Sequence, residues 1–190
     1  MFNLSTQEVV LSIEKSPLLV KEGIYYQHYQ NFFGNDILKN LESVENLRTE
    51  EFSYSGQHVI PGRQLIDYSE TAIKKMKILF SNEKITKSLE NKFDTKLKFG
   101  SVDVWTDKPG YFMAPHTDDP SIKLAVQIYL GEGQNVGTCL FDNNENILDR
   151  FEYKFNCGYA LLNNKASLHG LADKVPNNGN LRKSIYARYH

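Results

Sequence analysis

Two histidines and one aspartate in the second half of the chain have the residue types of a metal site. His116 and Asp118 stand two positions apart in the stretch YFMAPHTDDP. Residues two apart on an extended segment point to the same side, so this imidazole and this carboxylate can converge on one ion. His169 follows the β-rich stretch GYALLN and could complete the set from a neighbouring strand. Two imidazoles and one carboxylate on one face of an octahedron leave three positions open, which suits Fe(II) better than zinc.

A His-x-Asp triplet carries little weight alone, because a hydrogen-bonded polar loop would explain it equally well. The later residues strengthen the interpretation, because His169 is followed by Arg182 in the C-terminal stretch NLRKSIYARY. A keto acid that chelates a metal keeps a free carboxylate at its far end. A guanidinium group can bind such a carboxylate through two parallel hydrogen bonds. The pattern therefore offers both a metal site and an anchor for an anionic co-substrate.

The first half of the chain is expected to be mostly helical. Apolar residues recur at helical spacing in four stretches, which are residues 5–15, 34–44, 69–80 and 81–93. Between them, residues 51–68 carry two glycines and a proline and are less regular. We interpret this segment as a long loop or a lid, and Arg63 within it as a candidate substrate contact.

From Leu97 onward the pattern changes to short β-rich stretches bounded by Gly, Asn, Asp or Pro. Seven such stretches are predicted as strands: LKFGSVDVW, GYFMAPH, IKLAVQIYL, GTCLFD, RFEYKF, GYALLN and RKSIYARY. This number and spacing are typical of a sandwich or barrel. Helices followed by strands predict an α+β chain, with the helices on one outer face of the barrel.

Composition narrows the class of protein. The chain has 190 residues, 41% of them hydrophobic, and a net charge of −1, as expected of a globular domain without a strong electric field. It has no basic stripe, which argues against a nucleic-acid partner. The two cysteines form no CxxC pair, no apolar run is long enough for a membrane span, and the start lacks a secretory pattern. A cytoplasmic protein is expected.

The ordered set of motifs resembles the Fe(II)- and 2-oxoglutarate-dependent dioxygenase superfamily, and most closely its prolyl-4-hydroxylase-like branch. The resemblance covers residues 100–190 and rests on H-x-D followed by VQIYLGEG, VGTCLFD, SLHG and LRKSIYARY. It implies a double-stranded β-helix core (a jelly roll, or cupin-like barrel) with N-terminal flanking helices. It also implies one domain over 1–190, with 1–97 as helical support and lid region and 98–190 as the jelly-roll core.

The resemblance assigns roles to five residues. His116, Asp118 and His169 would bind iron and form the catalytic centre. Arg182 would bind the 5-carboxylate of 2-oxoglutarate, although the loop DKVPNNGN sets it farther from His169 than in typical prolyl hydroxylases. Tyr129 would place its hydroxyl group on the same carboxylate.

Three further residues have alternatives. Trp105 would lie beside the co-substrate or serve plain packing, and Gln127 shares the face of Tyr129 and could line the pocket. Arg188 competes with Arg182, because it follows six residues later on the same face. This R-x5-R pair resembles the alkyl-lesion demethylases, which use both arginines on the co-substrate. Those enzymes carry Asn-x-Tyr upstream, where this chain has DVW, so nucleic-acid repair is disfavoured.

The implied activity is that of an oxidoreductase that uses Fe(II), 2-oxoglutarate and O2. It would hydroxylate an unactivated C–H bond of a peptide or protein side chain or a small metabolite, and release succinate and CO2. One alternative is a non-catalytic jelly-roll module that binds a sugar or another small molecule. Another is a cupin-like enzyme without a keto acid, but this chain has no His-x-His ligand pair. Both the substrate and the oligomeric state stay open at this point.

Overall fold

Four helices form where helical spacing predicts them. The computed structural model describes residues 2–42, 49–54, 58–66, 70–133, 136–177 and 181–190. The helices are α1 (Phe2–Lys15), α2 (Asn35–Glu42), α3 (Glu70–Phe80) and α4 (Glu83–Phe93). Asn82 caps α4 by accepting a hydrogen bond from the amide of Lys84. Within the described ranges, no helix combines the length and the apolar character that crossing a membrane requires.

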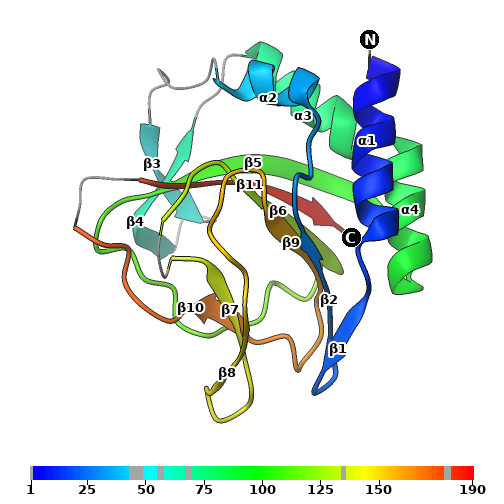
Figure 1. The fold of residues 1–190 in the computed structure, drawn as a ribbon. Helices are drawn as coiled ribbons and strands as arrows, with labels where there is room; N and C mark the ends of the chain where they lie inside the picture. Colours follow the sequence, from blue (N-terminus) through cyan, green and yellow to red (C-terminus); the bar gives the residue numbers. More distant parts are fainter. Residues whose placement is uncertain (1, 43–48, 55–57, 67–69, 134–135, 178–180) are drawn as a thin grey trace.

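The strands form two antiparallel sheets that face each other (Figure 1). The large sheet runs, in spatial order, through β1 (Leu19–Lys21), β2 (Ile24–Tyr29), β9 (Gly158–Leu162), β6 (Leu124–Tyr129), β11 (Arg182–Tyr189), β5 (Phe99–Asp107), β4 (His58–Ile66) and β3 (Thr49–Tyr54). The small sheet contains β10 (His169–Leu171), β7 (Thr138–Phe141) and β8 (Ile147–Arg150). Helices α1, α3 and α4 cover the outer face of the large sheet (Figure 1).

Successive side chains of the central strands point to opposite faces of the large sheet, either into the core under the helices or into the space between the two sheets. On β6, Leu124, Val126 and Ile128 are buried in the cluster that includes the helices. Gln127 and Tyr129, in between, face the other way, toward the small sheet. The helix-facing positions exclude water from one side of the sheet, so the opposite positions are free to carry polar groups.

Residues 51–68 are not the loop or lid that their composition indicates. Strands β3 and β4 form a hairpin, and β4 pairs with β5 through Arg63↔Asp107 and two further residue pairs. Tertiary pairing overrides local composition here, because β5 offers backbone partners to residues 63–65 and β3 pairs along the other side of β4. Residues 55–57 and 67–68 of that segment lie outside the described residues.

Three other expectations from the sequence need correction. Strands β1 and β2 were not predicted, so the first 97 residues give strands as well as helices to the structure. GYFMAPH is irregular apart from one bridge at His116. In RFEYKF only Arg150 belongs to a strand, yet Phe151 and Tyr153 are buried between the sheets. The alternating apolar residues of this stretch are buried, but their backbone does not pair as a regular strand.

Candidate functional site

The structure brings His116, Asp118 and His169 into one cluster. One ligand atom from each side chain lies within 4.8 Å of the others. The two histidines come together because their backbones pair: the amide of each donates to the carbonyl of the other, at 3.0 and 2.9 Å. Their ring centroids are 4.5 Å apart. Backbone pairing therefore sets the spacing of the two imidazoles.

Each of the three side chains is oriented by a second contact. Nδ1 of His116 lies 2.9 Å from the carbonyl of Ala114, and Nδ1 of His169 lies 3.0 Å from that of Ser167. A carbonyl only accepts, so both Nδ1 atoms carry a proton, which leaves Nε2 of each ring as the nitrogen that can bind a metal. Burial and the neighbouring His169 lower the pKa of His116, which favours the neutral imidazole that a metal requires.

The carboxylate of Asp118 is held by a tyrosine. The hydroxyl of Tyr186, on β11, donates to Oδ2 of Asp118 at 2.7 Å, while Oδ1 lies 3.9 Å from Nε2 of His169. Burial and then Asp118 raise the pKa of Tyr186 well above its usual value, so the hydroxyl keeps its proton. One carboxylate oxygen is thus occupied and the other faces the histidines. The donor set of two imidazoles and one carboxylate fits a divalent iron ion.

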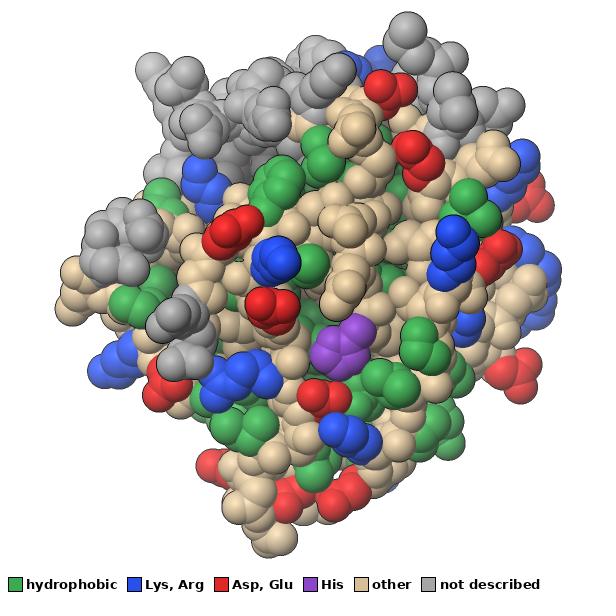
Figure 2. All heavy atoms as spheres, in the orientation of Figure 1, with side chains coloured by type: hydrophobic (Ala, Val, Ile, Leu, Met, Phe, Trp, Pro, Cys, Tyr) green, Lys and Arg blue, Asp and Glu red, His purple; other side chains and the backbone are tan. Residues whose placement is uncertain are grey.

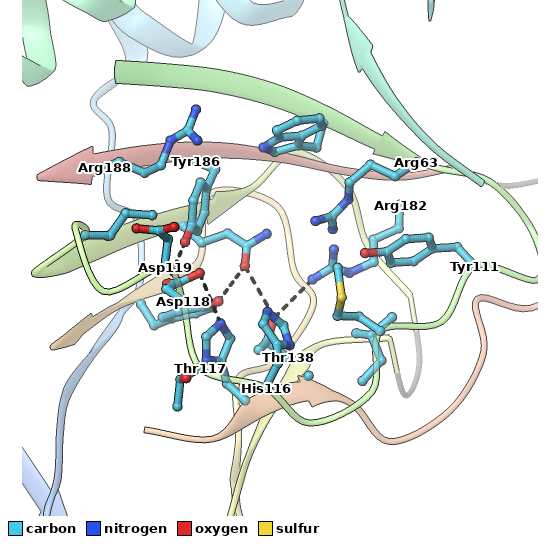
Figure 3. Close-up of a pocket in the computed structure, with 18 residues that line it drawn as sticks. Arg63, Tyr111, His116, Thr117, Asp118, Asp119, Thr138, Arg182, Tyr186 and Arg188 are labelled. Atoms are coloured by element: carbon cyan, nitrogen blue, oxygen red, sulfur yellow. Dashed lines mark hydrogen bonds and ion pairs between the residues drawn. The ribbon is translucent and has the colours of Figure 1, made fainter. Parts of the chain in front are cut away.

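The cluster opens into a cavity of about 380 Å³ between the two sheets (Figure 3). Small-molecule sites commonly have volumes from about 300 Å³ upward. Gln127 lies on its wall, where its side-chain carbonyl accepts from Tyr159 at 2.6 Å and its amide donates to Ser184 at 2.7 Å. Trp105, Met113 and Leu171 supply apolar lining. Trp105 therefore lies in the cavity wall, which agrees with the prediction that it lines the site and not with plain packing elsewhere in the core.

Arg182 reaches the same cavity from the start of β11 and is almost fully buried. It donates to the carboxylate of Asp107 at 2.7 Å, to the carbonyl of Val136 at 2.7 Å and to the hydroxyl of Thr138 at 3.1 Å. Burial opposes its charge, but the surrounding groups, first among them the carboxylate of Asp107, together outweigh burial and raise the pKa of Arg182. A permanently charged, fixed guanidinium group thus shares one cavity with the metal cluster.

Tyr129 supports Arg182 and is not part of the cavity wall. Its ring centroid lies 5.3 Å from the guanidinium carbon of Arg182, and its hydroxyl accepts from the amide of Thr138 at 2.9 Å. Accepting this bond leaves the hydroxyl proton free to be donated, so the contact with a co-substrate carboxylate stays a prediction.

Arg188 lies at the other end of the cavity from Arg182 (Figure 3). It forms an ion pair with Asp103, donates to Ser101 at 3.0 Å and lies over the ring of Tyr186. The two arginines share a strand face but do not converge on one place. The geometry thus favours Arg182 over Arg188 as the partner of a carboxylate in the centre of the cavity.

Asp107 and Tyr186 are site residues that the sequence did not reveal, whereas Arg63, named from the sequence as a candidate substrate contact, lines the cavity from β4. Asp107 lies on the cavity-facing side of β5, two residues from Trp105, and Arg63 pairs with it from β4. Alternation along VDVWTD could have indicated the side of the sheet that Asp107 occupies. The neighbouring strands could not be inferred from the sequence.

No family model matches this sequence, and no curated protein matches it. Solved structures match its fold. One is an oxidoreductase of the 2OG-Fe(II) oxygenase family from Burkholderia pseudomallei, with a TM-score of 0.62 at 13% identity over 86% of this chain and 84% of that chain. Another is a prolyl hydroxylase from Trichoplax adhaerens in complex with a hypoxia inducible factor peptide fragment, with 0.61 at 15% identity over 99% and 89%. The fold is that of the 2-oxoglutarate/Fe(II) oxygenases.

A third match carries ligands. HygX from Streptomyces hygroscopicus, solved with nickel, 2-oxoglutarate and hygromycin B, has a TM-score of 0.59 at 11% identity over 86% of this chain and 82% of that chain. These similarities confirm the predicted jelly-roll architecture with helices on its outside. At this level of identity the similarities do not assign roles to individual residues, which are argued from the geometry of the cavity.

Proposed function

We propose that this chain is an Fe(II)- and 2-oxoglutarate-dependent dioxygenase that hydroxylates an unactivated C–H bond. One observation carries the proposal: the cluster of His116, Asp118 and His169 shares a cavity with the buried guanidinium of Arg182, on this fold. A metal cluster alone would fit many activities. A fixed cation in the same cavity adds the partner that a dicarboxylate requires.

Each group has a defined task in this proposal. The three clustered side chains would hold iron and leave open coordination positions, and Arg182 would fix the 5-carboxylate of 2-oxoglutarate. Bound iron and 2-oxoglutarate would supply the activation of O2, with succinate and CO2 as products. Trp105 and Leu171 reduce the water around the reacting groups. No side chain needs to act as a general acid or base.

A peptide or protein side chain or a small metabolite is the proposed substrate. This range is supported by the similar structures, one with a bound peptide and one with hygromycin B. On the face shown in Figure 2, acidic and basic side chains are interspersed among the described residues, which supports a partner other than nucleic acid. The cavity does not support the alternative of a non-catalytic jelly-roll binding module, because such a module does not require a complete set of metal ligands.

We also propose a single domain over residues 1–190, because the large sheet contains strands from both halves of the chain. A cytoplasmic location is proposed as well. It is supported by Cys139 and Cys157, which are buried free thiols and suit a reducing compartment. Imaging of a tagged full-length chain would test the location.

The test is succinate formation by the purified chain supplied with Fe(II), 2-oxoglutarate and air. Candidate amino acids, peptides, sugars and nucleotides are added one at a time. A substrate is recognised by the succinate that it produces above background. We expect His116→Ala and Asp118→Ala to reduce succinate to the level without protein. His28→Ala is the matched control, because His28 lies outside the cavity. Full succinate production by both cluster variants would refute the proposal.

A further inference from the structure

One asparagine side chain reaches the backbone of the segment that carries Asp118. Nδ2 of Asn163 lies 3.3 Å from the carbonyl oxygen of Asp118 and 3.0 Å from that of Asp119. The carbonyl oxygen of Ile122 is closer still, at 2.8 Å. An amide nitrogen has two hydrogens to donate, so the three carbonyls share them. The backbone amide of Asn163 also donates to the carbonyl of Lys123, at 2.7 Å. This stretch of backbone is thus held at four points by a single residue.

The backbone around Asp118 has little other support. Residues 117–122 belong to no strand in the described part of the chain, so no ladder of hydrogen bonds fixes them. Within the described ranges, the one group outside 117–122 that donates to the carbonyls of Asp118 and Asp119 is the amide of Asn163. Tyr186 holds the carboxylate of Asp118 but not its backbone. The position of this carboxylate therefore depends on Asn163 as well as on Tyr186.

Asn163 also begins the loop that ends in His169. Side-chain and backbone hydrogen bonds close this loop into a turn: the hydroxyl of Ser167 accepts from the amide of Asn164 at 3.0 Å and donates to the carbonyl of Asn164 at 2.8 Å. Ser167 has no exposed surface, and its own carbonyl orients the ring of His169. Asn163 thus connects a closed turn that ends in one metal ligand to the backbone that carries another.

We propose that Asn163 is a positioning residue of the metal centre, which fixes Asp118 relative to His169 and so determines how tightly the cluster binds a divalent metal. Its amide nitrogen is directed at carbonyl groups, and Asn163 does not line the cavity, so it contacts neither metal nor substrate. Groups that orient metal ligands typically contribute roughly 10- to 100-fold to metal affinity. The inference rests on the proposed function, because it concerns the same cluster.

Metal titration without turnover tests the inference. Metal-free protein is titrated with Co(II), which stands in for Fe(II) and has a visible absorption that reports the coordination geometry. We expect Asn163→Ala to weaken Co(II) binding roughly tenfold and to alter the absorption spectrum of the saturated protein. Asn163→Leu keeps the size of the amide but has no donor. It should behave in the same way, which separates the loss of hydrogen bonds from the loss of packing.

The neighbouring asparagine provides the matched control. Asn164 lies on the same loop, but its amide donates to the carbonyl of Gly23 at 3.0 Å and its side-chain carbonyl accepts from the amide of Ala166 at 2.8 Å. Neither contact reaches the segment of Asp118. We expect Asn164→Ala to change the Co(II) affinity by less than about twofold, whatever its effect on the melting temperature.

A double-mutant comparison shows whether Asn163 acts through Asp118. In Asp118→Ala, no carboxylate is left for Asn163 to position. Adding Asn163→Ala to that variant should change its Co(II) affinity by less than about twofold, against roughly tenfold in the parent. A residue that only stabilised the fold would have the same effect in both backgrounds.

Four results would overturn the inference. They are parent-like Co(II) affinity of either Asn163 variant, equal losses of affinity in Asn163→Ala and Asn164→Ala, and equal effects of Asn163→Ala with and without Asp118. The fourth is loss of folded structure in both Asn163 variants, seen by circular dichroism, because Asn163 would then serve the fold.

Failure of the proposed function gives a different result. If the parent protein bound no Co(II) and formed no succinate, the proposed function would fail together with the inference. A parent that does both, with Asn163 variants that bind Co(II) equally tightly, would refute the inference alone.

Discussion

His116 and His169 are hydrogen-bonded backbone neighbours although they are distant in sequence. Each donates its amide to the carbonyl of the other, so the position of the two imidazoles is set before any metal binds. Preorganisation of this kind reduces the ordering that binding would otherwise require. It also makes the metal site sensitive to the packing of the two backbones that meet there.

Gly170 offers the sharpest way to separate the two backbones. A Cβ atom added at this position would lie 2.6 Å from the carbonyl oxygen of Met113 and 2.9 Å from backbone atoms of Ala114. We expect Gly170→Ala to push β10 away from His116, to reduce stability by about 1–3 kcal/mol and to weaken metal binding. Co(II) titration followed by absorption and thermal unfolding would measure both effects.

The control for that substitution is Gly133→Ala. At Gly133 the nearest atoms are 3.4 Å from the added Cβ and belong to side chains, so both quantities should stay close to those of the parent. Metal affinity of Gly170→Ala equal to that of the parent would show that the backbone contact does not position the histidines.

The hydrogen bond from Tyr186 to Asp118 should contribute to metal affinity. We expect Tyr186→Phe to weaken Co(II) or Fe(II) binding roughly tenfold, because groups that orient metal ligands typically contribute this much. Tyr159→Phe is the matched control, because its hydroxyl also lies in the cavity but donates to Gln127. Equal metal affinities of the two variants would contradict the proposed orientation of Asp118.

Arg182 and Arg188 can be ranked by their effect on the co-substrate. We expect Arg182→Gln to raise the 2-oxoglutarate concentration required for half-maximal succinate formation on the order of 100-fold, because charged hydrogen bonds are lost. Arg188→Gln should raise this 2-oxoglutarate concentration only slightly. Circular dichroism would verify that both variants fold, since Asp107 keeps Arg63 as a partner in the first. The reverse ranking would move the anchor to Arg188.

Asp149 links the two sheets and should make stability depend on acid pH. Burial opposes its charge, but hydrogen bonds, the largest from Tyr26 on β2, lower the pKa of Asp149 to about 2. A lowered carboxyl pKa stabilises the fold above the unfolded value, near 3.9, and this contribution disappears as pH falls toward 2. Because the group is partly solvated, we expect it to contribute about 1 kcal/mol.

Urea unfolding between pH 7 and pH 2.5 would measure this contribution. Asp149→Asn should be less stable than the parent at pH 7, and the difference should shrink below pH 4. Asp142→Asn is a suitable control, because its hydrogen bonds stay within one exposed turn. If Asp149→Asn differed in stability from the parent by the same amount at low pH, the charge of Asp149 could not be the cause of the difference.

The metal cluster was accessible from sequence because its information is local. The two-residue spacing of His116 and Asp118 and the placement of His169 after a β-rich stretch are readable without knowing the fold. Arg182 was identified for a similar reason, since it opens a strand of clear alternation. The four helices followed from apolar spacing alone.

What the sequence could not provide depends on which strands are neighbours. Asp107 becomes an arginine partner only because β5 lies between β4 and β11. Arg63 enters the cavity only because residues 58–66 join the sheet, which their glycine and proline content conceals. The contact between Tyr129 and Thr138 was hidden for a similar reason, because β7 belongs to the other sheet.

The order of the large sheet has a consequence for shortened forms of the protein. Both of its outermost strands, β1 and β3, come from the first 97 residues. A fragment beginning at residue 98 would leave β9 and β5 with open rows of amide and carbonyl groups along their sides. Such edges recruit strands from other molecules. We therefore expect the jelly-roll region alone to aggregate, however complete its set of metal ligands.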